Sequence, residues 1–146
     1  MRIAVGSDHA GYRLKQFLAA RLSELGHEVA DLGTHSEAAV DYPEFGAAVG
    51  RAVTAGQAQL GVCACGTGIG ISIAANKIDG VRAAVVHDTT TARLARAHNH
   101  ANVLCMGGRI VGDEVARDAL DAFLTTAPAG GRHEKRIEEI AGLEVR

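Results

Sequence analysis

Residues 60–77 read LGVCACGTGIGISIAANK, and they combine an apolar run, a glycine loop and the start of a helix. The run 60–63 predicts a short buried strand. The loop 65–70 has glycine at every second position from Gly66, and the residues after it predict a short helix toward Lys77. A buried strand that leads through a tight loop into a helix is the repeating unit of a parallel α/β sheet.

The rest of the chain repeats this alternation on both sides of the loop. Short apolar runs predict four further strands, at residues 3–6, 28–32, 81–86 and 103–106. Amphipathic stretches predict helices at residues 12–25, 43–55, 88–98 and 112–125, and a charged helix at 132–141. Strands separated by helices require right-handed crossovers, so we expect a three-layer, doubly wound, Rossmann-like α/β sandwich. Its mainly parallel sheet has five strands, the last helix is an extra C-terminal element, and residues 1–146 form one domain.

The composition narrows the class of protein. The 146 residues are 47% hydrophobic and 22% charged, with a net charge of −2, so we expect no nucleic-acid footprint and no polybasic membrane surface. No apolar run approaches the roughly 20 residues that a membrane span needs, and no secretory signal region is visible. Three cysteines are an odd number, which argues against a closed disulfide framework. We therefore expect a compact cytoplasmic protein.

Four segments of the chain follow the predicted strands and carry glycine or polar side chains. They are residues 7–9 (SDH), 65–70 (CGTGIG), 87–88 (HD) and 107–109 (GGR). Ligands of doubly wound sheets bind beside the carboxyl ends of the strands. We therefore expect these four segments to form the ligand site.

The glycine loop at 65–70 admits three interpretations. Its glycines let backbone N–H groups approach a ligand at a helix start, an arrangement that binds anions and oxyanions. A dinucleotide fingerprint requires G-x-G-x-x-G, but Ile71 stands where the third glycine of that frame belongs. Asp88 does lie at about the separation at which that motif places an acidic residue. A nucleotide site and a purely structural turn therefore remain alternatives to the anion site.

The three cysteines differ in their expected surroundings. Cys65 opens the glycine loop, where helix-start N–H groups favour a thiolate and where we expect no core position. Cys63 and Cys105 lie inside predicted strands, so we expect them in the core. A zinc site needs four ligands, and the chain contains no C-x-x-C or H-x-x-x-H partner for the cysteines, so no metal is predicted. A redox or metal protein based on Cys63 and Cys65 is the weaker alternative.

Two histidines and two arginines complete the candidates. His9 follows the first strand and His98 ends the helix after the fourth strand, and we expect both at the ligand edge. Arg132 and Arg136 are four residues apart, so they share one face of the last helix. They form either a solvated face or a clamp for a phosphate.

Five segments of the chain together resemble one known family. They are residues 6–11 (GSDHAG), 41–43 (DYP), 65–77 (CGTGIGISIAANK), 98–99 (HN) and 130–133 (GGRH). In order and spacing they are similar to the ribose-5-phosphate isomerase B family, a group that also contains galactose-6-phosphate isomerases. The resemblance covers essentially the whole chain, and the long match at 65–77 is its most specific part.

This resemblance implies a cofactor-free aldose–ketose isomerase that interconverts D-ribose 5-phosphate and D-ribulose 5-phosphate, in the non-oxidative pentose phosphate pathway. It assigns to Cys65 the proton transfer through a cis-enediolate, and to His98 the opening of the sugar ring. Thr67 and backbone N–H groups of the glycine loop would stabilise the enediolate oxygen as an oxyanion hole does. The loop residues concerned are Gly66, Gly68, Ile69 and Gly70.

The resemblance also implies how the rest of the phosphosugar is held. Asp8 and Asn99 would bind sugar hydroxyls. The phosphate would lie against four basic side chains: His9, Arg109, Arg132 and Arg136. In the family the site lies between two subunits, with the C-terminal arginines facing the partner. We therefore expect a homodimer with shared active sites, or a dimer of such dimers.

Some members of the family lack this cysteine and use a glutamate just after the glycine loop. The corresponding residue of this chain is Ile71, which cannot take up a proton, so Cys65 remains the candidate base. The preferred sugar stays open, because erythrulose 4-phosphate, galactose 6-phosphate and allose 6-phosphate are alternative substrates within the group. A non-catalytic nucleotide-binding α/β module is the alternative from another class.

Overall fold

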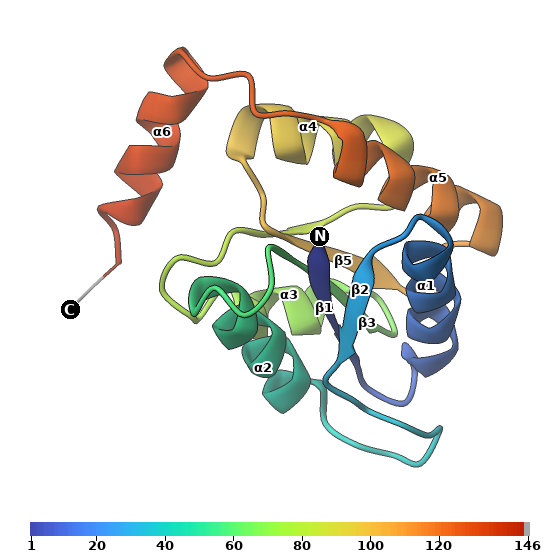
Figure 1. Ribbon diagram of the computed structural model, residues 1–146. Coiled ribbons are helices and arrows are strands. Elements are labelled where there is room, and N and C mark those ends of the chain that lie inside the picture. Colours follow the sequence, from blue (N-terminus) through green and yellow to red (C-terminus); the bar gives the residue numbers. More distant parts are fainter. Residues whose placement is uncertain (145–146) are drawn as a thin grey trace.

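The computed structural model describes residues 1–144, so the last two residues of the expected domain lie outside the described residues. Within that range five strands alternate with six helices (Figure 1). The strands are β1 (Arg2–Ser7), β2 (Glu28–Asp31), β3 (Leu60–Cys65), β4 (Ala83–Val85) and β5 (Val103–Gly107). The helices are α1 (Tyr12–Glu24), α2 (Tyr42–Thr54), α3 (Ile69–Ala75), α4 (Thr89–Asn99), α5 (Asp113–Thr125) and α6 (Arg132–Ala141). No helix in the described range is long and apolar enough to cross a membrane.

The strands form one parallel sheet in the order β2-β1-β3-β5-β4. The chain builds outward from β1 to β2 and then returns to the other side of β1 with β3. The strand order therefore reverses between β1 and β3, which is where doubly wound sheets bind their ligands. The parallel five-stranded sheet confirms the expected fold class.

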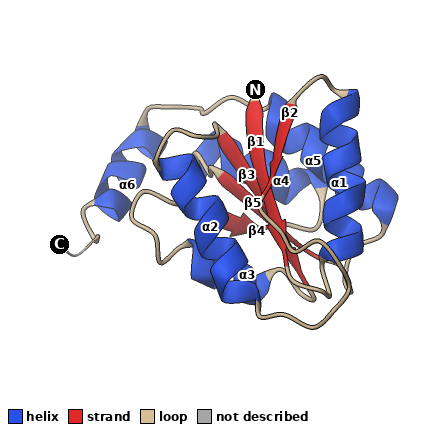
Figure 2. Ribbon diagram, turned by 60° about the horizontal axis from the view of Figure 1, so that its bottom comes forward, coloured by secondary structure: helices blue, strands red, loops and turns tan. Residues whose placement is uncertain are grey.

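Helices cover both faces of the sheet (Figure 2). On one face, apolar side chains of α1, α4 and α5 pack with Ile3 and Val5 of β1 in one core cluster. On the other face, α2 and α3 pack with Ala4 in a second cluster. Successive side chains of a strand point to opposite faces, so the same strands supply both clusters. This arrangement is the expected three-layer sandwich.

Helix α6 lies outside the layered body, as expected for an added C-terminal element (Figure 1). The segment before it is tied to α4, because the Ala129 N–H donates to the Ala97 carbonyl at 2.8 Å. The segment after it is tied to the main body, where Glu144 Oε1 accepts the Gly80 N–H at 2.5 Å. All ten residues of α6 lie in the described range, and none of them is buried.

Cys65 differs most from its expected surroundings. Strand β3 continues through Cys65, which therefore ends a strand instead of opening a loop, and its exposed fraction is only 3%. The expectation that Cys65 avoids a core position is wrong, because β3 lies between β1 and β5 and stays paired with β5 as far as Cys65. Ser7 of β1 is still paired with Ala64, and Gly107 of β5 is still paired with Cys65. The expected core placement of Cys63 and Cys105 is confirmed, since both are 0% exposed.

A buried lysine ties the first helix to the loop after β2. Lys15 is 1% exposed, and its Nζ donates to both oxygens of Asp31, at 2.6 and 2.8 Å. The same Nζ donates to the Thr34 carbonyl at 2.5 Å. The backbone of this loop bonds in turn to the end of β1, since Ser7 exchanges two 2.8 Å hydrogen bonds with Gly33 and Thr34. Lys15 therefore supports the carboxyl end of β1.

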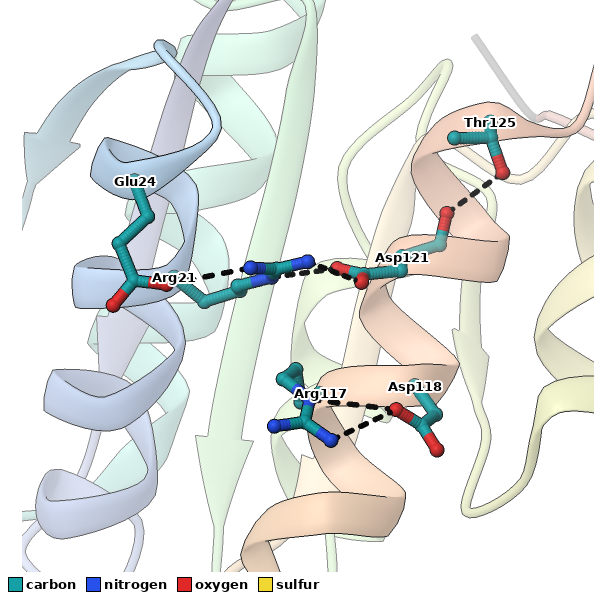
Figure 3. A network of polar contacts seen from close by, with 6 residues as sticks. All are labelled: Arg21, Glu24, Arg117, Asp118, Asp121 and Thr125. Atoms are coloured by element: carbon teal, nitrogen blue, oxygen red, sulfur yellow. Dashed lines mark hydrogen bonds and ion pairs between the residues drawn. The ribbon is translucent and has the colours of Figure 1, made fainter.

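A second polar network joins α1 to α5 on the same face of the sheet (Figure 3). Nε and Nη2 of Arg21 donate to the two carboxylate oxygens of Asp121, at 3.0 and 2.6 Å. Hydrogen bonding to Asp121 raises the pKa of Arg21 above its ordinary value. The paired geometry fixes the angle between two helices that are far apart in the sequence, since a bidentate pair restricts orientation as well as distance.

The Lys15 contacts predict a loss of stability in a specific variant. Lys15→Met keeps the buried hydrocarbon stem but leaves Asp31 and the Thr34 carbonyl without the ammonium. We expect the free energy of unfolding to fall by about 2–3 kcal/mol, as breaking a buried ion pair strands its partner. Urea unfolding followed by circular dichroism measures this loss.

The control for this variant is Glu28→Gln, which removes an exposed ion pair. Arg2 Nε lies 3.5 Å from Glu28 Oε1, and the two side chains are 50% and 70% exposed. Exposed pairs contribute little, so we expect a loss below about 1 kcal/mol. Equal losses in the two variants would contradict the structural role of Lys15.

Candidate active site

A cleft of about 610 Å³ opens at the carboxyl edge of the sheet, beside the ends of β1, β3 and β5. It brings together eight of the residues singled out from the sequence. They are Asp8, His9, Cys65, Gly66, Thr67, Ile69, Gly70 and Arg109. Of the four segments expected to form the ligand site, those after β1, β3 and β5 meet in this cleft, whereas residues 87–88 after β4 do not line it.

The side chain of Cys65 lines this cleft. The Gly68 N–H donates to Sγ at 3.2 Å. Helix α3 begins only at Ile69 and has seven residues, so the contact with the sulfur comes from one backbone N–H before the helix. An N–H that points at sulfur is a stronger partner for a thiolate than for a thiol, because charge on the acceptor strengthens the bond. The cleft therefore holds a cysteine whose charged form has a fixed donor.

The glycine loop has its shape because it lies directly on the end of β5. Gly68 has φ +78°, and a Cβ added there would lie 2.7 Å from the Met106 carbonyl carbon. A Cβ at Gly107 would lie 2.7 Å from the Thr67 carbonyl carbon. Real Cβ atoms do not approach backbone so closely, so neither position accepts a side chain without movement. The glycines thus allow two backbone segments to stack at van der Waals distance.

Backbone hydrogen bonds join the same two segments and place Arg109. The Gly108 N–H donates to the Cys65 carbonyl at 2.8 Å, and the Arg109 N–H donates to the Gly66 carbonyl at 3.0 Å. The guanidinium of Arg109 then covers Gly66, where an added Cβ would lie 3.3 Å from Nη1. Thr67 Oγ1 accepts the Ile69 N–H at 3.2 Å, which holds its hydroxyl at the start of α3. A cation, a hydroxyl and a thiol therefore share one side of the cleft.

The turn after β1 supplies the opposite side. Asp8 is 5% exposed, and its Oδ1 accepts the Gly11 N–H at 2.9 Å. A Cβ added at Gly11 would overlap the carbonyl carbon of Ala64, so this turn also packs backbone against backbone, next to Cys65. The Nδ1 atom of His9 lies 3.1 Å from the carbonyl oxygen and 3.2 Å from the amide nitrogen of Val40. The loop before α2 thereby holds the His9 ring.

Four of the expected site residues lie on α4 and α6 and do not line this cleft: His98, Asn99, Arg132 and Arg136. Helix α4 begins at the carboxyl edge and runs back, so its last residues reach the amino ends of the strands. Asn99 lines a second cleft of about 250 Å³ together with Arg82 and Ala101, which precede β4 and β5. The expectation that His98 and His9 share one edge is therefore wrong within one chain.

His98 instead belongs to a basic cluster between α4 and α6. Its ring stacks on His133 with centroids 4.2 Å apart and an angle of 6°. Desolvation, and then the positive charges of His98, Arg132 and Arg136, lower the pKa of His133. Arg132 and Arg136 are exposed on α6. His133, Arg132 and Arg136 thus lie in the first half of a helix that stands outside the layered body.

Several residues that line the main cleft had no assigned role in the sequence. They are Ala10, Val40, Asp41, Tyr42 and Ile73. Tyr42 packs on the glycine loop, since a Cβ added at Gly70 would overlap its ring. The segment 41–43 was part of the family resemblance, and that resemblance was the available signal for Tyr42. His133 likewise appeared in the sequence only within segment 130–133 of that resemblance.

Cys63 and Cys105 lie side by side in the core, where their thiols form a hydrogen bond. A hydrogen bond with Cys63, followed by burial, raises the pKa of Cys105 well above its usual range. Both side chains pack in the cluster beneath α2 and α3. Across residues 1–144, His, Cys, Asp and Glu side chains form no group of three or more that could hold a metal ion.

Comparison with known proteins identifies the family. A family model described as Ribose/Galactose Isomerase matches residues 3–140. Ribose-5-phosphate isomerase B of Escherichia coli is 47% identical over 145 residues, which cover 99% of this chain and 97% of that protein. Galactose-6-phosphate isomerase subunit LacB of Clostridium acetobutylicum is 44% identical over 124 residues, or 85% of this chain and 72% of that protein.

A solved structure agrees with these sequence matches. Ribose-5-phosphate isomerase B of Clostridium thermocellum aligns with a TM-score of 0.97 and 48% identity, and the alignment covers 98% of this chain and 97% of that one. Sequence, fold and the sheet-edge cleft lead to the same assignment. This chain belongs to the ribose/galactose isomerase family.

Proposed function

We propose that this protein is an aldose–ketose isomerase that interconverts D-ribose 5-phosphate and D-ribulose 5-phosphate. The observation that carries the proposal is the Cys65 sulfur, which lies in the cleft and accepts the Gly68 N–H at 3.2 Å. Further support comes from the Escherichia coli protein named ribose-5-phosphate isomerase B, which matches nearly the full length of this chain. The free thiols suit a reducing compartment, so we place the enzyme in the cytoplasm.

The proposed reaction moves a proton between neighbouring carbons of the open-chain sugar. The Cys65 thiolate removes the proton from C2, and the electron pair of that bond forms the C1–C2 double bond while O1 takes the negative charge. The proton on O2 passes to O1. The thiol then returns its proton to C1 as the C2 carbonyl forms, which restores the thiolate. One base on one face of a cis-enediolate therefore completes the reaction in either direction.

The groups around the thiol suit the two ends of such a substrate. The Thr67 hydroxyl and the backbone of the glycine loop would bind the enediolate oxygens, whose negative charge exists only during the reaction. Asp8 has one carboxylate oxygen on the Gly11 N–H, which leaves the other for a sugar hydroxyl. His9 and Arg109, which both line the cleft, would bind the phosphate.

A second copy of the chain completes the proposed site. The partner's His98 would open the sugar ring, and its Asn99 would bind a hydroxyl. The partner's Arg132 and Arg136 would bind the phosphate. Two observations support this arrangement: Arg132 and Arg136 are exposed on α6, and Ile69 and Ile73 at the rim of the cleft are 54% and 56% exposed. We propose a homodimer with shared sites, which two copies could extend to a dimer of dimers.

The thiol assignment predicts the result of one substitution. Cys65→Ala removes the base and should reduce kcat on the order of 10³-fold, because a positioned general base contributes rates of that size. Formation of ribulose 5-phosphate from ribose 5-phosphate is followed spectrophotometrically. Cys63→Ala changes the same strand two residues earlier and should keep kcat within about twofold, since its side chain lies in the core. Equal activity of the two variants would refute the assignment.

The shared site predicts that two inactive variants restore each other. Cys65→Ala and His98→Ala chains are co-refolded, and each variant alone serves as the control. Half of the resulting dimers should be mixed, and each mixed dimer has one intact site, so activity should recover to about a quarter of the wild-type value. A mixture as inactive as its parents, or an active monomer in light scattering, would rule out the shared site.

The substrate is tested with a panel of phosphosugars. Coupled assays give kcat/KM for ribose 5-phosphate, erythrulose 4-phosphate, galactose 6-phosphate and allose 6-phosphate. We expect the highest value for ribose 5-phosphate, because the relative of that name matches this chain end to end, whereas LacB is matched over 72% of its length. A tetrulose or hexose phosphate that exceeds it more than tenfold would show that the substrate is a different one.

A further inference from the structure

His87 lies at the carboxyl edge of the sheet and has no role in the proposed reaction. It follows β4, whose last ladder bond is donated by the Val86 N–H to the Cys105 carbonyl at 3.0 Å. The backbone then leaves the sheet, because Asp88 caps α4 with its side chain on the Thr91 N–H at 2.7 Å. The next N–H of β5 belongs to Gly107, and it donates to Nε2 of His87 at 3.0 Å. The imidazole thus accepts the hydrogen bond that a backbone carbonyl of β4 would have accepted if the strand had continued.

The peptide held by His87 is the one on which the glycine loop lies. Gly107 is paired with Cys65 across β3 and β5. A Cβ added at Gly68 would lie 2.7 Å from the Met106 carbonyl carbon and 3.1 Å from the Gly107 nitrogen. The N–H of the peptide between Met106 and Gly107 therefore donates to His87, and Gly68 of the glycine loop packs on the atoms of the same peptide. A shift of this peptide has to move Gly68, since the contact leaves no gap.

Gly68 carries the donor that reaches the thiol. Its N–H lies on Cys65 Sγ at 3.2 Å, so only one peptide separates the His87 bond from the contact on sulfur. The Gly107 carbonyl also accepts the N–H groups of Ile110 and Val111, at 3.0 and 3.1 Å, and so closes the turn that presents Arg109. The N–H of Gly107 therefore bonds to His87, and its carbonyl bonds to the turn that contains Arg109.

We infer that His87 is a positioning residue for Cys65: its Nε2 holds the Gly107 N–H so that the glycine loop keeps the Gly68 N–H on the sulfur. This inference rests on the proposed function of Cys65 as the base. It requires a neutral ring whose proton is on Nδ1, because only an unprotonated Nε2 accepts a hydrogen bond. His87 does not touch the substrate in this arrangement, and its effect passes through the backbone.

The test compares His87→Ala, His87→Gln and Asp88→Ala. Alanine removes the acceptor, whereas the glutamine Oε1 extends about as far from the backbone as the histidine Nε2 and accepts without carrying a proton. Asp88→Ala is the matched control, because it removes the cap of α4 but leaves the bond to Gly107 in place. Each variant is measured for kcat, KM and thermal unfolding.

The expected result separates kcat from KM. His87→Ala should lower kcat about tenfold with KM within about twofold, since the loss of one hydrogen bond of about 1.4 kcal/mol affects the base more than substrate binding. His87→Gln should recover most of kcat. Asp88→Ala should lower the unfolding temperature and leave kcat within about twofold. An unchanged kcat in His87→Ala, or an equal loss in His87→Gln, would overturn the inference.

Two measurements are independent of turnover. The rate of Cys65 alkylation by iodoacetamide, read by peptide mass spectrometry, should fall in His87→Ala and be restored in His87→Gln. Cys63 and Cys105 are 0% exposed and serve as internal controls. In the wild-type protein, a long-range ¹H–¹⁵N spectrum should show the His87 proton on Nδ1. A proton on Nε2, or alkylation that is not slowed, would overturn the inference.

These readouts keep the two proposals apart. A wild-type protein that isomerises no phosphosugar would end the proposed function, while the tautomer and the alkylation rate would still decide whether His87 supports the thiol. Conversely, normal turnover in His87→Ala would end the inference and leave the role of Cys65 untouched.

Discussion

Backbone packed directly on backbone at the carboxyl edge of the sheet is the constraint on which the site depends. At Gly11, Gly68 and Gly107 an added Cβ would meet main-chain atoms of a neighbouring segment closer than side chains are found to approach. The turn after β1, the glycine loop and the end of β5 are therefore held at fixed distances from one another. This packing holds the Gly68 N–H on the Cys65 sulfur in advance. A preorganised donor of this kind does not have to reorient when charge develops, whereas water molecules do.

The sequence predicted the elements and one half of the site because both follow from local patterns. Apolar runs located the strands, and the rule that ligands bind at carboxyl ends selected Asp8, Cys65 and Arg109 for one cleft. His98 was misplaced for a geometric reason: a helix that follows a strand returns to the opposite edge of the sheet, so its last turn lies far from the strand's end. The burial of Cys65 was missed because the lengths of its neighbouring strands are not a local property.

The basic cluster on α6 illustrates a second limit of sequence patterns. An i,i+4 pair of arginines is equally compatible with a solvated face and with a phosphate clamp. In the structure α6 stands away from the sheet and none of its residues is buried, while desolvation, followed by neighbouring positive charge, lowers the pKa of His133. Positive groups held close together repel one another unless an anion joins them. The proposed phosphate contacts of Arg132 and Arg136 would join an anion to these charges, and the position of α6 outside the layered body is compatible with the proposed site shared between two chains.

The proposed use of cysteine as the base is compatible with its burial. Ile71, at the position where some family members have glutamate, is 0% exposed and fills the cluster beneath α2 and α3. A carboxylate in the place of Ile71 or of Cys65 would lose its hydration at a large cost in free energy, and it would need several hydrogen-bond donors. A thiol is different, because its neutral form behaves as a small hydrophobe in the same space. Cys65 can therefore end a core strand while its sulfur accepts the Gly68 N–H. The packing of the glycine loop on β5 supplies that N–H, and so the same contact that stabilises the edge of the sheet also holds a donor on the sulfur of the proposed base.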